Sequence, residues 1–290
     1  MPLKKKKKFD YIDVIANVFM VLFSITILYP MLHVIAVSLS DSYYIMANKV
    51  SIFPMGFTLE SYAYFLERSE IISGFFNAVW YTVEGIAANL IFTALMAYPL
   101  SKMKLIGRSL IMKMCVFTMY FSGGLIPIFI QIKEMGLMNT EWAWILGELI
   151  ATTNLIILIN GYQSIPDSLY EAAYLDGASE FQVFYKIALP LTKASLASIG
   201  LFYFIAHWNN WFSPMLYLKD KAKFPLQLLM REILIENSEQ SHGSELTELE
   251  LTPVGIKNAL IVMSMIPVMI VYPFVQKYFV KGVMMGSVKG

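Results

Sequence analysis

Charged residues are scarce in this sequence, and so are cysteines. Charged side chains make up 15% of the 290 residues, whereas a typical soluble domain has about 25%. Hydrophobic residues reach 57% and aromatic residues 14%. A soluble chain of this length could not bury so much apolar surface in one core. We therefore expect lipid to be the solvent for much of the chain.

The residues that several function classes need are also missing. A single cysteine, Cys115, can form neither an intrachain disulfide framework nor a four-thiolate zinc site. The three histidines are too far apart for an HExxH-type motif, so we expect no metal site. A net charge of +1 gives no basic field for nucleic acid. Neither a Walker A loop nor a GxGxxG fingerprint occurs, so any ATP must bind to another chain.

Long apolar runs are the main positive signal, because a helix needs about 20 such residues to span a membrane. We predict six spans, at residues 14–37, 71–100, 109–132, 142–162, 189–213 and 256–280. They give an all-α integral membrane protein with a transmembrane domain at residues 14–280. The first run is longer than the 7–15 residues of a signal-peptide core. We therefore favour a retained helix over a cleaved signal peptide.

The distribution of basic residues predicts the orientation of the spans. Most of the 22 Lys and Arg residues fall on the N-terminal side of the first span and in the loops on that same side. We therefore expect a cytoplasmic basic N-terminus (1–13), a cytoplasmic C-terminal tail (281–290) and longer extracytoplasmic loops at 38–70 and 219–255. Within the second of these loops, residues 226–236 have the pattern of a short amphipathic helix.

The cytoplasmic connection between the fourth and fifth predicted spans has the pattern of two short helices around a tight turn. We expect Ser164 to cap the first helix, with Pro166 in its first turn. Gly177 would supply the left-handed residue that ends this helix. Ser179 and Gln182 are spaced for a capping box at the start of the second helix.

This loop also has a surface of small residues beside carboxylates. Its members are Leu169, Ala172, Ala173 and Ala178, next to Glu171 and Asp176. Such a surface lets the groove of another protein approach closely, with carboxylates placed to meet basic groups. The alternative is a solvated connector helix, which composition alone does not exclude.

The same residues resemble a known family. The loop at 164–190 matches the EAA loop of ABC-importer permease subunits at Glu171-Ala172-Ala173, Gly177, Ile187 and Leu189-Pro190. Asp176 and Phe184 resemble the longer form of this loop in sugar permeases, whereas Ala194 replaces a further proline that many of them have. Ser101-Lys102 and Trp208-Asn209-Asn210-Trp211-Phe212 also look like sugar-permease segments. The likeness is greatest to carbohydrate importers related to the maltose-transporter permeases, in the branch named for LplC.

The resemblance implies the ABC type I importer permease fold, in a bacterial cell membrane. It implies a second permease subunit, two cytoplasmic ATPase subunits, an extracytoplasmic solute-binding protein and a carbohydrate cargo moved by alternating access. The chain itself would be no enzyme, with no catalytic residue and no cofactor, because ATP and Mg²⁺ would bind to the ATPase subunits. The EAA helix would couple the ATPases to the membrane helices through Glu171, Ala172, Ala173, Asp176, Gly177 and Phe184.

Two alternatives come from other function classes. A stand-alone secondary transporter typically shows an internal repeat and ion-coupling residues at the membrane midplane, and we see no convincing repeat. An intramembrane enzyme would have to use residues such as Glu84, Glu148 and His207. No nucleophile–base motif or metal-ligand spacing supports such an enzyme.

Polar side chains inside the predicted spans are candidates for a substrate pathway. Glu84 and Glu148 should face protein or water, because a charge in the hydrocarbon is costly. A structural contact between helices is an equally good interpretation for both, and amides such as Asn89 more often hold helices together. Aromatic rings beside amides suit a sugar pathway, which favours the following set at the end of the fifth span: Tyr203, His207, Trp208, Asn209, Asn210 and Trp211.

The sequence leaves the cargo open among a disaccharide, an acidic oligosaccharide and a longer polysaccharide. Two glutamates in the spans would argue mildly against a polyanionic cargo if both faced the pathway.

Overall fold

The computed structural model describes residues 11–240 and 253–286. The lysines of the predicted basic N-terminus, residues 241–252 of the second outer loop and the last four residues of the tail lie outside the described residues.

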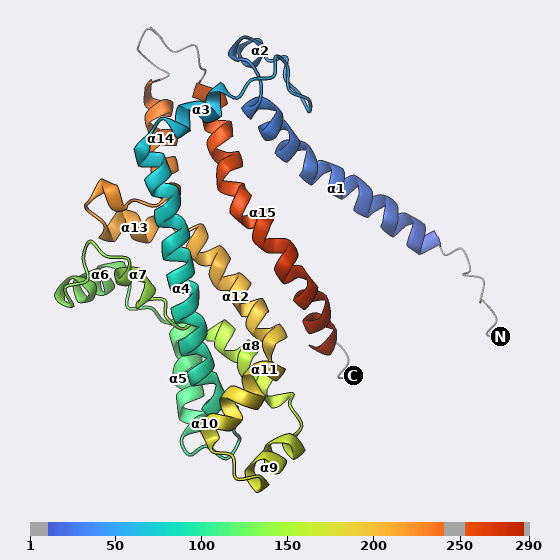
Figure 1. The fold of residues 1–290 in the computed structure, drawn as a ribbon, viewed down its shortest axis with the longest axis vertical. Coiled ribbons are helices and arrows are strands. Elements are labelled where there is room, and N and C mark those ends of the chain that lie inside the picture. Colours follow the sequence, from blue (N-terminus) through green and yellow to red (C-terminus); the bar gives the residue numbers. More distant parts are fainter. Residues whose placement is uncertain (1–10, 241–252, 287–290) are drawn as a thin grey trace. The chain divides into compact units, whose positions relative to one another are not determined.

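Regular structure in the described residues is helical, apart from one isolated bridge between Ser40 and Phe57. This confirms the predicted all-α fold (Figure 1). The helices are α1 (Tyr11–Ser38), α2 (Ser42–Met46), α3 (Glu60–Leu66), α4 (Ser69–Ser101), α5 (Arg108–Tyr120), α6 (Leu125–Glu134), α7 (Trp142–Ile145), α8 (Thr152–Gln163), α9 (Asp167–Leu175), α10 (Glu180–Val183), the π-helix η1 (Phe184–Ala188), α11 (Leu189–Leu191), α12 (Lys193–Trp208), α13 (Phe212–Tyr217), the 3₁₀ helix η2 (Lys221–Lys223), α14 (Leu226–Gln240) and α15 (Pro253–Gly286).

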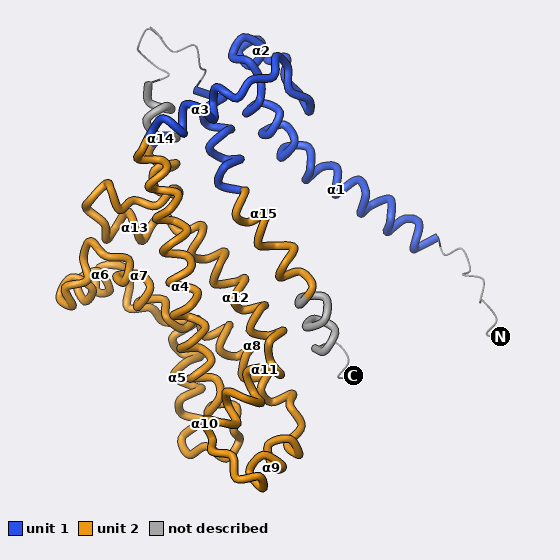
Figure 2. The backbone as a smooth tube through the Cα atoms, viewed as in Figure 1, with its two compact units in different colours: residues 1–68, 233–265 blue, residues 69–232, 266–290 orange. Residues whose placement is uncertain are grey.

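The chain divides into two compact units, coloured separately in Figure 2. Unit 1 comprises residues 1–68 and 233–265, and unit 2 comprises residues 69–232 and 266–290.

In unit 1, the first predicted outer loop is folded around the end of α1. The Ser40 hydroxyl donates to the carbonyl of Ala36 at 2.7 Å and accepts from the Met55 N–H at 3.0 Å. The hydroxyls of Ser38 and Tyr62 lie 2.7 Å apart, which joins α1 to α3. Long-range bonds therefore order this loop.

The rest of α1 is exposed and apolar on all sides. Its side chains from Tyr11 to Leu32 are exposed, and its apolar window has a mean hydropathy of 2.2. A helix that is apolar all round is suited to lipid or to the surface of another membrane protein.

In unit 2, α4 is the central helix and packs against α8 and α12 (Figure 1). One buried cluster joins the C-terminal half of α4 to α8 and to the loop of α9 and α10. A second cluster joins the N-terminal half of α4 to α7, α13 and the start of α14. The two clusters give unit 2 a core along the whole length of α4.

Side-chain hydrogen bonds hold both ends of α4. At its start, Asn77 donates to the carbonyls of Ala222 and Phe224, and Tyr81 donates to that of Lys223. At its end, the Arg108 guanidinium donates to the Leu100 carbonyl at 2.7 Å. That bond satisfies one of the carbonyls that a helix end leaves free.

The six predicted spans are confirmed only in part. Three helices are long and apolar enough to cross a membrane, namely α1, α4 and Pro253–Lys277 of α15. Two further spans are possible if bent pairs are counted, with bends of 114° between α5 and α6 and of 77° at the start of α12. The predicted span at 142–162 consists of the short helices α7 and α8 with six non-helical residues between them.

The sequence explains two of these breaks. Gly124 precedes α6 with a φ of +87°, a conformation open to glycine but costly for other residues. Pro190 lies just before the bend at Thr192 and cannot donate a backbone hydrogen bond. The predicted spans at 109–132 and 189–213 are thus interrupted rather than continuous.

A close contact between α8 and α12 leads to the first prediction. A Cβ atom at Gly161 would lie 2.7 Å from Ser195 Oγ and 3.1 Å from Ser195 Cβ. We expect Gly161→Ala to lower the thermal midpoint of the detergent-purified protein. The reason is that overpacking costs about 1–3 kcal/mol, while alanine's better helix propensity returns only about 0.5–1 kcal/mol.

Gly200→Ala is the matched control, because a Cβ there would meet Leu90 at an ordinary 3.6 Å. It should leave the midpoint unchanged or raise it slightly. Equal midpoints for the two variants would contradict the close contact.

Candidate functional site

The loop at 164–190 forms the two helices that the sequence predicts. Gly177 follows α9 with a φ of +79°, and Ser179 and Gln182 form the predicted capping box of α10. The predicted start of the first helix was wrong: α9 begins at Asp167 with Pro166 as its N-cap residue. The Ser164 hydroxyl instead donates to the Gly161 carbonyl of α8, because α8 continues to Gln163.

The predicted coupling residues separate into exposed and buried groups. Glu171, Ala172, Asp176 and Gly177 are exposed, together with Leu175 at 89%. Ala173 is buried on the opposite side of α9, within the core cluster of α4 and α8.

Phe184 lies in the same cluster, with its ring centroid 5.0 Å from that of Tyr98 on α4. Ala173 and Phe184 therefore fix the loop to unit 2. The exposed residues of the loop, from Glu171 to Gly177, form a free surface.

A second site surrounds the non-helical residues 146–151 between α7 and α8. The Asn89 amide on α4 donates to the carbonyls of Glu148 and Leu149 at 2.7 and 3.0 Å. The Tyr203 hydroxyl on α12 accepts from the Ala151 N–H at 3.1 Å and contacts the Thr93 hydroxyl at 2.8 Å. Irregular backbone at membrane depth needs such partners, because lipid offers none.

His207 belongs to this second site. Its Nε2 lies 2.8 Å from Asn89 Oδ1, and since an amide oxygen only accepts, Nε2 carries the proton. The ring packs so closely over Gly85 that a Cβ atom there would lie 2.6 Å from it. His207 is 8% exposed and Tyr203 3%, so both face the interior of unit 2.

The other aromatic and amide candidates do not form one cluster with His207. Trp208 is buried between Phe75 and Phe204, with ring centroids 6.2 and 6.3 Å away. The Asn210 side-chain oxygen accepts from the Ser213 N–H at 3.1 Å, in the first turn of α13.

Asn209 and Trp211 are the exposed members of the set. The Asn209 amide donates to the Ile205 carbonyl at 3.0 Å, and the Arg231 guanidinium lies 4.5 Å from the Trp211 ring centroid.

The two glutamates differ in surroundings. Glu84 is half-buried on α4, and its Oε2 is buried without a hydrogen-bond partner among the described residues. Glu148 is exposed on the non-helical segment, and among the described residues its hydrogen bonds are those of its backbone, from its N–H to Trp144 and from Asn89 to its carbonyl.

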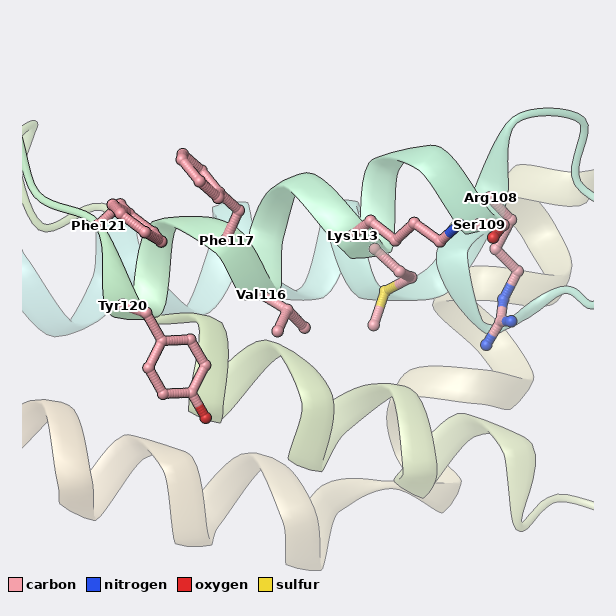
Figure 3. Close-up of a pocket in the computed structure, with 8 residues that line it drawn as sticks. Arg108, Ser109, Lys113, Val116, Phe117, Tyr120 and Phe121 are labelled. Carbon is pink, nitrogen blue, oxygen red and sulfur yellow. The ribbon is translucent and has the colours of Figure 1, made fainter.

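A hollow along α5 is separate from all of these residues. It has a volume of about 570 Å³ and is lined by Arg108, Ser109 and Lys113 at one end and by Val116, Phe117 and Tyr120 toward the other (Figure 3). None of the predicted pathway residues lines it, so this hollow does not mark the predicted pathway.

Sequence reasoning missed Thr93 and Gly85, which complete the second site. Glycine and threonine inside an apolar span are common and point to no particular partner. The available signal was spacing: Gly85 lies four residues before Asn89 and Thr93 four residues after it, and such residues share one face of a helix.

Two curated relatives from Bacillus subtilis (strain 168) match nearly the whole chain. The polygalacturonan/rhamnogalacturonan transport system permease protein YtcP is 42% identical over 280 residues, which cover 96% of this chain and 98% of the relative. Protein LplC is 41% identical over 268 residues, or 92% of this chain and 90% of LplC. No family model matches the chain.

A solved structure agrees with these relatives. A chain from a bacterial ABC transporter involved in the import of the acidic polysaccharide alginate is 33% identical, with a TM-score of 0.85. The match covers 96% of this chain and 100% of that one. The chain therefore belongs to the permease subunits of ABC carbohydrate importers, and it is a multi-pass membrane protein.

The bonds of Asn89 lead to the second prediction. Asn89→Leu leaves two carbonyls of the non-helical segment without donors. We expect a lower thermal midpoint of the detergent-purified protein, because a buried group without its partner costs about 1–3 kcal/mol, although interhelical bonds in membranes average only about 0.6 kcal/mol.

Asn160→Leu serves as the control, because Asn160 is exposed on α8 and its side chain makes no hydrogen bond within the described residues. Equal midpoints for the two variants would show that Asn89 does not support the segment.

Proposed function

We propose that this chain is one of two permease subunits of an ABC importer that carries an acidic oligosaccharide into the cytoplasm. Two ATPase subunits drive the transport through α9, which serves as the coupling helix. The observation that carries this proposal is the free surface of α9, formed by Glu171, Ala172, Leu175 and Asp176.

The chemistry of this surface fits a protein groove. Leu175 exposes an apolar side chain beside the exposed carboxylates of Glu171 and Asp176, on a loop that we place in the aqueous phase. Ala172 adds no bulk, and the two carboxylates can meet basic groups of an ATPase cleft. The buried Ala173 holds the opposite side of α9 against unit 2, so a push on α9 reaches the membrane helices.

The non-helical residues 146–151 form one wall of the transport pathway in this proposal. Backbone without helical structure is tolerated at membrane depth where it is buried in protein or lines a water-filled cavity. Backbone groups of Leu149 and Ala151 have protein partners, because they bond to the side chains of Asn89 and Tyr203.

Gly147 and Glu148 are exposed, so they line a water-filled cavity or face the partner permease. Asn209 and Trp211, which follow α12, are the aromatic and amide candidates that remain accessible. Tyr203 and His207 act indirectly, by holding the segment in place.

Relatives support an acidic cargo. The name of YtcP refers to polygalacturonan and rhamnogalacturonan, and the solved transporter imports alginate. All of these polysaccharides contain uronic acids. In this proposal Glu148 faces the partner permease rather than the cargo, because a free carboxylate at the pathway would repel an acidic sugar.

Family membership supports the remaining partners of this proposal. A solute-binding protein delivers the cargo to the outer face, where we place residues 38–70 and 219–255. ATP and Mg²⁺ bind to the ATPase subunits, so this chain needs no cofactor and catalyses no reaction. Both termini lie in the cytoplasm of the bacterial cell.

Gly177 yields the third prediction. Its φ of +79° disfavours side chains with a β-branch, and a Cβ atom there would meet nothing within 4 Å of the same chain. We expect Gly177→Val to lower ATP-dependent uptake at least tenfold in proteoliposomes while ATP hydrolysis persists, because the turn that positions α9 is altered.

Gly107→Val is a closely matched control. Gly107 has a φ of +78°, has the same free space, and lies in the loop before α5. Both variants place a β-branched side chain at nearly the same positive φ, so a difference between them reflects the loop in which each residue lies. Uptake by Gly107→Val should stay within twofold of the wild type, and equal losses in both variants would argue against the coupling role of α9.

The fourth prediction concerns the complex and its cargo. Purification of the tagged chain from its host in mild detergent should recover a second permease, an ATPase and a solute-binding protein. ATP hydrolysis by this complex should rise with oligogalacturonides and stay basal with maltotriose. Transport by the chain alone without ATP would overturn the proposed function, and stimulation by neutral sugars alone would overturn the cargo.

A further inference from the structure

Lys102 is enclosed by three tyrosine rings where α4 ends. Its Nζ lies 4.8 Å from the ring centroid of Tyr98, 3.6 Å from that of Tyr170 and 5.9 Å from that of Tyr174. Tyr98 belongs to α4, whereas Tyr170 and Tyr174 belong to α9. A cation over aromatic faces is attracted by their negative quadrupoles, more strongly where water is excluded.

Glu180 also joins α4 and α9, through hydrogen bonds. The Tyr98 hydroxyl donates to Glu180 Oε2 at 3.0 Å, and the Tyr174 hydroxyl donates to Oε1 at 2.8 Å. One carboxylate at the start of α10 therefore bridges α4 and α9. We call Lys102, Tyr98, Tyr170, Tyr174 and Glu180 the lysine cage.

Burial shifts the pKa values of those cage residues that lie outside the membrane-spanning segments. It lowers the pKa of Lys102, which the negative charges of Glu180 and Asp167 partly oppose. Burial also raises the pKa of Tyr170 to about 12, so its hydroxyl stays protonated and its ring keeps a neutral face. The cage thus holds a cation close to neutral rings and a carboxylate.

The covalent route from the coupling loop to the membrane is bent. The chain from α10 through η1 and α11 meets α12 at an angle of 77°, at the break beside Thr192. A helix break is where packed elements can hinge.

The cage instead leads to α4, which runs without a break from Ser69 to Ser101. On α4, Asn89 and Thr93 lie a few turns from the cage and hold the non-helical segment directly or through Tyr203.

We propose that the lysine cage fixes the coupling helix α9 to α4, so that the two move as one body and ATPase movement reaches the non-helical segment 146–151 through α4. Lys102 is then a positioning residue for transport. This inference rests on the proposed function, since it assumes that an ATPase moves α9.

A set of substitutions tests the part played by the cation. In the reconstituted complex, Lys102→Met keeps most of the apolar stem and removes the charge. We expect the amount of sugar transported per ATP hydrolysed to fall at least fivefold, and Lys102→Arg to stay within twofold of the wild type. The control is Lys104→Met, because Lys104 is exposed in the same loop and outside the cage.

The amount of sugar transported per ATP hydrolysed separates a positioning role from a role in stability. Loss of folded complex lowers transport and hydrolysis together and leaves their ratio unchanged. A ratio for Lys102→Met within twofold of the wild type would overturn the proposal.

A second measurement tests whether α9 and α4 move as one body, even if Lys102→Met fails to assemble. Spin labels at Ser168→Cys on α9 and Leu95→Cys on α4, in a Cys115→Ala background, report the distance between the two helices in the otherwise wild-type complex. We expect the same distance distribution without nucleotide and with the ATPases trapped in the ATP-bound state.

A distance that changes between the two states would overturn the inference, because α9 would then move independently of α4. Such a complex would still transport with ATP, so this failure is distinct from a failure of the proposed function, in which no ATP-driven uptake is observed.

Discussion

The fold of unit 2 depends on the hydrogen bonds that Asn89 donates to the carbonyls of Glu148 and Leu149. A membrane helix satisfies its own backbone, so a break in it exposes polar groups that lipid cannot satisfy. Here the amide on α4 supplies the missing donors, at 2.7 and 3.0 Å. His207 in turn donates to the same amide and fixes its orientation. The open segment between α7 and α8 can persist only with these partners.

This requirement gives α4 its central place. Near its start, Asn77 and Tyr81 bond to the backbone of the loop at 222–224. In its middle, Asn89 and Thr93 bond to the segment at 146–151 and to Tyr203. At its end, Tyr98 bonds to Glu180 of the cytoplasmic loop. One unbroken helix thus contacts three irregular regions, and a tilt of α4 would move all of them together.

How much of this could be predicted depends on whether a feature is local. The turn at Gly177 and the capping box of Ser179 and Gln182 involve neighbours in sequence, and both were predicted correctly. The break at 146–151 depends on α4, some 60 residues earlier in the chain, so hydrophobicity alone predicted a continuous span. Tyr203 and His207 have the composition of a sugar site, and in the structure both are buried and hydrogen-bonded to protein groups. Only contacts between helices reveal these bonds, because the residue types that suit a sugar site also suit contacts between helices.

The exposed residues of unit 2 are of two kinds, and their difference bears on assembly. Apolar side chains along α5 and α12, such as Phe117 and Phe202, can face lipid without cost. Glu148 and Asn209 are also exposed but polar, and a carboxylate at the centre of a bilayer costs about 2.5–3.5 kcal/mol on insertion scales. Their surface must therefore face water or another protein. An isolated chain would present this surface to lipid, so the polar exposure of the broken segment supports the proposal of a second permease subunit.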